Sequence, residues 1–357
     1  MSVLVVVGGQ FGSEGKGKLT SYLAAHDDAA VVVRCGGPNA GHTVDHRGER
    51  HVVRQVPAGY VNPRSRLLLA AGSVVDVEQL LQEVSLHAVE SRLGIDPNAA
   101  VLRRSDQELE ATLQLRKRIA STLSGTGVAT SRKVLRDETL ELAGRVNALS
   151  SWITDVAGEV NQTHDNGDLV LVEGTQGFGL SLHHGDVYPY RTSRDTTAAG
   201  FLSEVGLSPF TVTDIVLVVR TFPIRVGGHS GPLANEISWE DVRHRSGYPR
   251  PVEEYTSVSK TLRRIGLFDM AIVKRAASIN RPTHIAVHGL DYLSYKDYGI
   301  TNFDDLSEVS RSFVQRLEDT LGVSATFLFT GPPNECLIDR RSRESRKTFS
   351  SCEAVRA

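Results

Sequence analysis

The sequence predicts an α/β fold with a mainly parallel central sheet flanked by helices, and two observations carry this prediction. Short apolar runs recur along the chain with helical patterns between them. The runs are continuous rather than alternating, as strands covered on both faces should be. The first run leads directly into a glycine- and lysine-rich loop, and a strand, such a loop and a helix form the usual layout for binding phosphates.

Buried strands are predicted at Val3–Val7, Ala30–Val33, Arg66–Leu69, Leu169–Val172, Ile215–Val219, Ile285–Val287 and Thr326–Phe329. Helical spacing of apolar residues is found at Val77–Val84 and Phe268–Ala276, and a longer helix is expected over Thr139–Thr163. No internal repeat and no linker rich in proline or serine divides the chain. We therefore expect one catalytic domain over residues 1–338, followed by a polar, basic and loosely packed tail over residues 339–357.

Composition excludes several classes of function. The chain has 357 residues, 40% apolar and 23% charged, with a formal net charge of −2. This balance gives no overall attraction to nucleic acid or to an anionic membrane, so neither partner is expected. Cys35, Cys336 and Cys352 lack metal-binding spacing and are interpreted as reduced thiols. Because the sequence shows no signal peptide and no apolar run of membrane length, we expect a cytoplasmic protein.

The loop after the first predicted strand is the most informative stretch of the chain. Its glycines allow backbone N–H groups to turn toward an anion, and Lys16 and Lys18 add positive charge. The spacing of Gly12, Gly17 and Lys18 approaches a Walker A loop, but Leu19 occupies the position of the magnesium-binding Ser or Thr. The loop is therefore predicted to bind phosphates, though not as the common nucleoside triphosphatases do.

Other polar segments follow predicted strands. Arg34–Thr43 contains Asn39, which can donate and accept hydrogen bonds, and His42, which can exchange a proton near neutral pH. Val172–Gly177 contains Gln176. In open α/β sheets the carboxyl ends of strands form the ligand-binding edge. Taken singly, each segment is also explained by an ordinary turn or a satisfied buried side chain.

In order along the chain, these motifs resemble those of adenylosuccinate synthetases. The first loop resembles G-x-Q-[WF]-G-D-E-G-K-G-K, and later segments resemble N-A-G-H-T at Asn39–Thr43, F-E-G-A-Q-G at Val172–Gly177, Y-P-Y-V-T-S-S-N-T-T-A at Tyr188–Ala198 and T-G-P at Thr330–Pro332. The resemblance extends from Val5 to Pro332. It implies a ligase that joins L-aspartate to C6 of a purine nucleotide through a 6-phosphoryl intermediate, using a nucleoside triphosphate and Mg²⁺.

The resemblance also implies which residues bind each substrate. The triphosphate is expected at Gly12, Ser13, Glu14, Gly15, Lys16, Gly17, Lys18, Gly41, His42, Thr43, Arg263, Asp291, Thr330, Gly331 and Pro332. The purine monophosphate is expected at Ser13, Asn39, Ser124, Gly125, Arg136, Gln176 and Thr192, with Arg136 reaching the partner's phosphate across a homodimer interface. L-aspartate is expected at Ser257, Val258, Ser259, Arg263 and Arg264, and Mg²⁺ at Ser13 and the Gly41 carbonyl.

Three positions depart from the family pattern. Ser13 stands where the family has its catalytic aspartate, Thr261 replaces an arginine that reaches the ribose edge, and Gly289 replaces the lysine of a guanine-reading K-x-D. Guanine carries an amino group beside N1, and the smaller Ser13 leaves room for that group and can accept its hydrogen bond. We therefore expect dGMP as the acceptor, with ATP, dATP or GTP as the donor and His42, Gln176 and Ser13 as catalytic residues.

The expected product is N6-succino-2-amino-2′-deoxyadenylate, a precursor of diaminopurine DNA, as in the phage branch of the family, whose members would work in the host cytoplasm. Two alternatives stay open. One is a conventional synthetase that uses IMP and GTP, and the other is a non-catalytic nucleotide-binding protein. The group that removes the N1 proton is also open, with Ser13 acting through water as the first candidate and Glu14 as the second.

Overall fold

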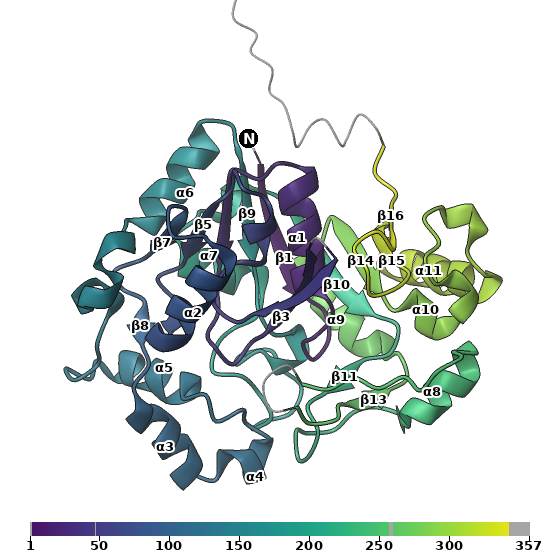
Figure 1. Cartoon of the computed structure of the whole chain (residues 1–357). Coiled ribbons are helices and arrows are strands. Elements are labelled where there is room, and N and C mark those ends of the chain that lie inside the picture. Colours follow the sequence, from purple (N-terminus) through teal and green to yellow (C-terminus); the bar gives the residue numbers. More distant parts are fainter. Residues whose placement is uncertain (1, 47, 257–259, 343–357) are drawn as a thin grey trace, which may run out of the picture.

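The computed structural model describes residues 2–46, 48–256 and 260–342. A nine-stranded sheet runs through the molecule and carries helices on both faces (Figure 1). In spatial order its strands are β16 (Leu337–Asp339), β15 (Ala325–Phe329), β14 (His284–His288), β10 (Val212–Arg220), β1 (Ser2–Gly8), β9 (Leu169–Glu173), β2 (Val31–Arg34), β5 (Arg66–Leu69) and β7 (Leu93–Ile95). Only the pairing of β15 with β16 is antiparallel, so the predicted fold class is confirmed.

The central strands are apolar throughout because each face of the sheet packs on a separate hydrophobic core. In β1, Val3, Val5 and Val7 belong to one core, whereas Leu4 and Val6 belong to the other. The first core contains residues of α6 (Val156–Asp165), α7 (Ala198–Val205), α9 (Met270–Asn280) and α11 (Glu308–Leu321), and the second contains residues of α1 (Lys16–His26) and α2 (Val77–His87). Burial on both faces explains why the strand runs do not alternate.

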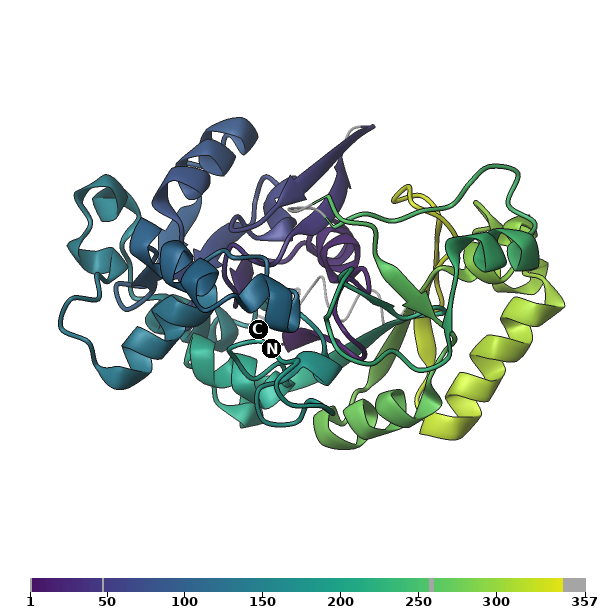
Figure 2. The ribbon, with the colours of Figure 1, turned by 90° about the horizontal axis from the view of Figure 1, so that it is seen from below.

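Two groups of smaller elements extend beyond the carboxyl ends of the parallel strands. One comprises α3 (Arg104–Thr112), α4 (Leu115–Ile119), α5 (Thr126–Leu135) and the strand pair β6 (Val74–Val75) and β8 (Ala100–Val101). The other comprises β11 (Ile224–Arg225), β12 (Glu236–Ile237), β13 (Arg264–Gly266), α8 (Trp239–Ser246) and α10 (Leu290–Leu293). The hairpin of β3 (His42–His46) and β4 (Glu49–Val53) follows β2. Figure 2 shows the two groups on opposite sides of the molecule.

The predicted strands are all present, with shifts only at their ends, but the helix predicted over Thr139–Thr163 is wrong in its first half. Ala143–Arg145 and Asn147–Trp152 form short 3₁₀ turns instead. The α-helix α6 begins only after Asp155, whose side chain accepts a hydrogen bond from the Gly158 N–H and caps the helix. Asp155 is a residue type that favours the start of a helix, but apolar residues also precede it, so the sequence pattern does not show where the helix begins.

The packed chain continues beyond residue 338, where the domain was predicted to end. Asp339 belongs to β16, and Arg341 is only 6% exposed. The Arg341 guanidinium pairs with the buried Asp27 carboxylate at 2.6 Å and with Asp339 at 2.7 Å. Asp27 caps α1, so the pair fastens the last described strand to that helix. Loose packing is therefore wrong for residues 339–341, and residues 343–357 lie outside the described part.

Replacing Arg341 with Met is expected to lower the free energy of unfolding by about 3–5 kcal/mol, because the buried Asp27 carboxylate would lose the guanidinium that donates to both of its oxygens. Arg340 is a matched control, since its side chain is 30% exposed and pairs with Glu318. Arg340→Met should cost less than about 1 kcal/mol. Urea unfolding of both variants measures the difference, and equal losses would contradict a buried fastening role for Arg341.

The composition of the chain predicted reduced cysteines and no membrane-spanning helix. Cys35 and Cys336 are buried free cysteines, and burial raises the pKa of both thiols above its ordinary value. Cys352 lies outside the described residues. Within the described ranges, no helix has the length and apolar character required to cross a bilayer. The described cysteines therefore behave as small core residues and carry no sign of reactivity.

Candidate active site

A cavity of about 910 Å³ opens where β1, β2, β9, β10 and β14 end. It is lined by residues from all the sequence motifs, because the carboxyl ends of parallel strands meet at one edge of the sheet. Among the predicted site residues, those lining it are Gly12, Ser13, Glu14, Gly15, Lys16, Gly17, Lys18, Asn39, Gly41, His42, Thr43, Ser124, Gln176, Thr192, Arg263, Asp291, Gly331 and Pro332.

Some predicted residues are not brought to this cavity. Gly125, Arg136, Arg264 and Thr330 do not line it in the described part of the chain. Thr330 is fully buried and donates to the Ile300 carbonyl, while Arg136 is exposed at the end of α5. Ser257, Val258 and Ser259 lie outside the described residues.

The phosphate loop (residues 8–18) is organised around the buried carboxylate of Glu14. That carboxylate accepts hydrogen bonds from the N–H groups of Gln10 and Gly12, at 3.1 and 2.7 Å, and from Lys16 Nζ at 2.6 Å. Gly15 has a φ of +103°, and a Cβ there would lie 2.4 Å from the ring of His288. Both oxygens of Glu14 are engaged inside the loop, which favours Ser13 over Glu14 among the candidate proton acceptors.

The two lysines of the phosphate loop have different partners. Lys16 pairs with Glu14, whereas Lys18 Nζ donates to the carbonyl oxygens of Gly331 and Pro333 at 2.7 and 2.6 Å. Burial lowers the pKa of Lys18 to about 8. The Lys18 ammonium group thus contacts a neighbouring loop, although Lys18 lines the cavity, and its predicted contact with the phosphates stays a prediction.

Ser13 lies between two arginines. Its Oγ accepts a hydrogen bond from Arg263 Nη1 at 2.7 Å, and its carbonyl accepts one from Arg220 Nη1 at 3.2 Å. Arg220 is buried and forms an ion pair with Glu254. A hydroxyl oxygen has two lone pairs and one hydrogen, so Ser13 retains one acceptor position and one donor for a ligand in the cavity.

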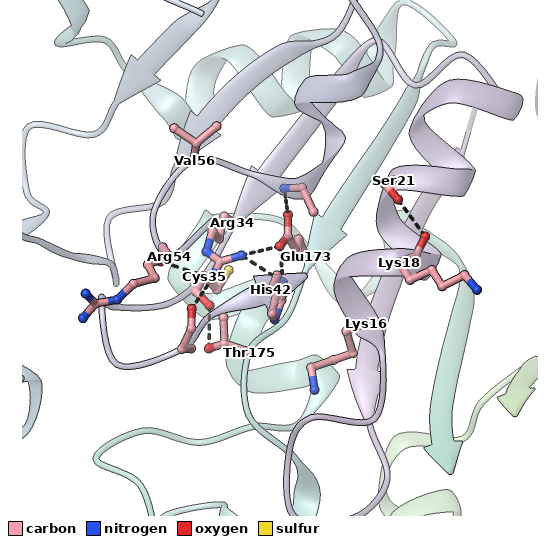
Figure 3. A network of polar contacts seen from close by, with 12 residues as sticks. Lys16, Lys18, Ser21, Arg34, Cys35, His42, Arg54, Val56, Glu173 and Thr175 are labelled. Atoms are coloured by element: carbon pink, nitrogen blue, oxygen red, sulfur yellow. Dashed lines mark hydrogen bonds and ion pairs between the residues drawn. The ribbon is translucent and has the colours of Figure 1, made fainter. Parts of the chain in front are cut away.

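His42 is held by a buried carboxylate (Figure 3). Glu173 Oε1 contacts both His42 Nδ1 and Arg34 Nη1, and Oε2 accepts the Ala58 N–H at 2.7 Å. Although burial acts to raise it, the charge of Arg34 and the hydrogen bonds from His42 and from the Ala58 N–H keep the pKa of Glu173 below its ordinary value. An ionised carboxylate at Nδ1 requires that atom to carry hydrogen, which assigns the tautomer from its hydrogen bonds.

This tautomer limits what His42 can do. Burial and the Arg34 charge lower the pKa of His42 to about 4, so the ring is neutral near pH 7. With hydrogen on Nδ1, Nε2 is an acceptor. The predicted donor role of His42 therefore needs a second proton on the ring.

Three buried charges at this edge escaped the sequence-based predictions. Arg34, Glu173 and Arg220 are the last residues of β2, β9 and β10, and each follows a run of buried apolar residues. A charged residue that ends an otherwise buried parallel strand is the signal that could have revealed them. Ser124 was predicted, but its hydroxyl partner Thr122 was not, although both line the cavity and their oxygens lie 3.1 Å apart.

The segment predicted to bind aspartate is only partly placed in the cavity. Arg263 lines it, but the Arg264 guanidinium donates to both carboxylate oxygens of Glu236, at 2.8 and 2.6 Å, and to the Gly231 carbonyl at 2.7 Å. Because β12 and β13 are paired, Arg264 faces the neighbouring strand. The predicted contact of Arg264 with a substrate carboxylate is not supported in this arrangement.

At the other end of the cavity, Asp291 is a buried acceptor. Tyr248 Oη donates to Asp291 Oδ2 at 2.5 Å, and burial raises the pKa of this carboxyl group. Gly289 precedes α10 with a φ of +81°, which favours glycine. Asp291 lines the cavity together with Gly331 and Pro332, which offer backbone and apolar surface.

The residues that line the cavity could hold Mg²⁺ only if a bound substrate supplied further oxygen ligands. Among the described residues, no group of three or more His, Cys, Asp or Glu side chains could hold a metal ion. Gly41 and Ser13 both line the cavity, and the Ser13 hydroxyl already accepts one hydrogen bond, from the Arg263 guanidinium. Mg²⁺ commonly binds through few protein oxygens plus substrate phosphates, and the residues present fit that mode.

Comparisons with known proteins agree with this geometry. The family model described as adenylosuccinate synthetase matches residues 5–143 and 137–298. The adenylosuccinate synthetase of Pyrococcus horikoshii is 40% identical over 346 residues, which cover 96% of this chain and 99% of that protein. The enzyme of Thermococcus sibiricus is 41% identical over 347 residues, with the same coverage of 96% and 99%.

Two solved structures share the fold. The fully ligated adenylosuccinate synthetase of Plasmodium falciparum superimposes with a TM-score of 0.84 at 22% identity, covering 96% of this chain and 100% of that one. The succinoaminodeoxyadenylate synthetase (PurZ) of cyanophage S-2L, bound to dGMP and to dATP as an energy donor, gives a TM-score of 0.79 at 28% identity, covering 98% of each chain.

Proposed function

Because the chain belongs to the adenylosuccinate synthetase family and is a ligase of that type, we propose that its purine substrate is dGMP. It would join L-aspartate to C6 and yield N6-succino-2-amino-2′-deoxyadenylate. The observation that carries the proposal is Ser13, a small neutral residue at the position where the family pattern has a carboxylate. Its hydroxyl has one acceptor position left beside Arg263, which suits the 2-amino group of guanine.

Support from relatives is divided, and this keeps a second candidate in view. The cyanophage enzyme is described with dGMP and dATP bound, and it covers nearly the whole chain. The archaeal relatives, which are more similar in sequence, are described as adenylosuccinate synthetases. The conventional reaction with IMP and GTP is therefore the alternative to the dGMP reaction.

The arrangement supports the following steps. Purine O6 attacks the γ-phosphorus while the N1 proton leaves and the nucleoside diphosphate departs; the amine of L-aspartate then displaces phosphate from C6. Neutral His42 can accept at Nε2, so the N1 proton, passed on through a water held by Ser13, would turn it into a donor to the 6-oxygen or the transferred phosphate. The phosphate loop and the Gly41 carbonyl would hold the triphosphate with Mg²⁺, which neutralises phosphate charge.

Purified protein supplied with L-aspartate, Mg²⁺ and ATP, together with dGMP, GMP or IMP, tests the proposal. Mass spectrometry of the products distinguishes the outcomes. A succino-adduct formed from dGMP in preference to IMP supports the proposal, and GMP tests whether the ribose hydroxyl is tolerated. Turnover of IMP alone indicates the conventional enzyme, and no turnover with any purine indicates a non-catalytic nucleotide-binding protein.

We expect ATP or dATP to support turnover at least as well as GTP. Gly289 lacks the side chain that the family pattern uses beside Asp291, and an adenine amine can donate to that carboxylate. Gly289→Lys should shift the ratio of kcat/KM values toward GTP by about tenfold relative to Gly289→Ala. The Ala variant is the control, because a Cβ at this position lies 3.0 Å from Thr221 Oγ1 and both changes share that strain. Strict dependence of the unaltered protein on GTP would overturn this expectation.

We propose a homodimer in which Arg136 completes the partner's monophosphate site. Arg136 is exposed and does not line the cavity of its own chain. Arg136→Ala should raise the KM for the purine monophosphate and leave the fold intact. In an equal mixture with His42→Ala chains, about a quarter of the sites should regain activity, since half of the dimers are hybrids with one complete site. Mixtures that stay as inactive as the separate variants would count against a shared site.

A further inference from the structure

Lys18 occupies the position where a Walker-like pattern places a phosphate-binding lysine, but it is surrounded by backbone carbonyls and an aromatic ring. Its side chain is buried, and Nζ donates to the carbonyl oxygens of Gly331 and Pro333 at 2.7 and 2.6 Å. The same ammonium group lies 4.7 Å from the ring centroid of Phe329. Figure 3 shows the Lys18 side chain directed away from Lys16 and His42. Two hydrogen bonds and a ring contact thus satisfy this cation inside the protein.

The segment that Lys18 contacts forms part of the cavity wall. The base loop, defined here as residues 330–334, follows β15, and its members Gly331 and Pro332 line the cavity together with Asp291. Asn334 Nδ2 donates to the Asp45 carbonyl in β3, which fastens the loop at its other end. The loop is therefore held on one side by the phosphate-loop helix and on the other by the β3–β4 hairpin.

The two ends of a nucleoside triphosphate need different chemistry. Phosphates suit the N–H groups and charge at the start of α1, where Lys16 lies. A purine base suits a wall with an apolar surface and one buried acceptor, which Pro332 and Asp291 provide. Lys18 is the side chain that joins these two places, since it leaves the first turn of α1 and ends on the base loop.

We propose that Lys18 is a positioning residue that holds the base loop in place for the purine base of the triphosphate and makes no contact with the phosphates. The inference rests on the proposed use of a nucleoside triphosphate, but it is independent of whether dGMP or IMP is the acceptor. Loss of Lys18 would remove the side-chain donor to the Gly331 carbonyl, leave the Pro333 carbonyl with the Cys336 N–H alone, and let the base loop move. Lys16 differs, because its one described partner, Glu14, belongs to the phosphate loop itself.

Binding measurements on the full chain separate the two roles. Isothermal titration with MgATP and with magnesium tripolyphosphate compares a ligand that has a base with one that has none. Lys18→Met should weaken MgATP binding by about tenfold and change tripolyphosphate binding by less than about twofold. Lys16→Met should weaken both ligands by similar factors. Equal weakening of both ligands by Lys18→Met would overturn the proposal.

The ratio of the affinities for ATP and GTP provides a second measurement, and Lys18→Arg provides a second variant. The ratio of the Kd values for ATP and GTP should change in Lys18→Met, because base selection depends on the loop, and should stay constant in Lys16→Met. If Lys18→Met does not fold, Lys18→Arg keeps the charge but not the geometry of two short bonds to carbonyls. Lys18→Arg should still lose MgATP affinity and retain tripolyphosphate; unchanged MgATP affinity would show that charge alone suffices. Neither measurement uses dGMP, so failure here is distinct from failure of the dGMP proposal.

Discussion

Replacing His42 with Asn is expected to lower kcat by roughly a hundredfold to a thousandfold with either dGMP or IMP as substrate. The 6-oxygen chemistry is common to both purines, and Asn cannot take up a proton at the position of Nε2. The buried contacts with Glu173 and Arg34 hold the His42 ring in one orientation. Steady-state kinetics with both purines measure the effect.

His51→Asn is the matched control for this change. His51 lies in β4, the strand paired with β3, and it does not line the cavity. Its replacement should change kcat less than about twofold, since the ring packs against Tyr60 and His87 and not against the cavity. A His42→Asn variant that keeps more than a tenth of the activity would remove His42 from the catalytic account.

Replacing Ser13 with Asp is expected to lower turnover of dGMP and to raise turnover of IMP. The larger carboxylate would fill the space for the 2-amino group and would form an ion pair with Arg263, which now donates to the Ser13 hydroxyl at 2.7 Å. A hydrogen bond lost to a buried substrate amine is worth roughly 1–3 kcal/mol. The ratio of kcat/KM values for the two purines should therefore shift by about tenfold to a hundredfold toward IMP.

Ser13→Ala separates the loss of the hydrogen bond from the loss of space. Alanine keeps the room beside N1 but offers no acceptor, so dGMP turnover should fall less than in Ser13→Asp and IMP should gain nothing. Ser13 has a φ of 57°, a conformation that Asp adopts more readily than Ala, so the two variants are compared by their purine ratios and not by their absolute rates. Identical purine preferences in the unaltered protein and in Ser13→Asp would show that Ser13 does not select the substrate.

The sequence predicted the fold where burial decides it. Each apolar run became a strand of the sheet, because strands covered on both faces carry an unbroken pattern. The predictions were wrong where a hydrogen bond or an ion pair determines where an element begins or ends. The helix expected over Thr139–Thr163 breaks at the cap formed by Asp155, and Arg341 is held by Asp27, which lies at the other end of the chain.

The candidate site shows the same difference between features that burial determines and features that polar partners determine. Motif residues meet in one cavity because they follow neighbouring strand ends, but a motif does not give the direction of a long side chain. Lys18 and Arg264 both belong to motifs of the site. The Lys18 ammonium group nevertheless binds the Gly331 carbonyl, and the Arg264 guanidinium binds Glu236 on the neighbouring strand. The contact of Glu173 with His42 joins residues 131 positions apart and depends on β2 and β9 being adjacent.

The most direct test of the account is a competition between dGMP and IMP at equal concentration, with L-aspartate, Mg²⁺ and saturating ATP. The ratio of the two succino-adducts formed at early times gives the ratio of the kcat/KM values. We predict a ratio of at least about ten in favour of dGMP, the value expected from one hydrogen bond to the 2-amino group. Formation of the IMP adduct with none from dGMP would contradict the assignment of Ser13 as the residue that admits guanine.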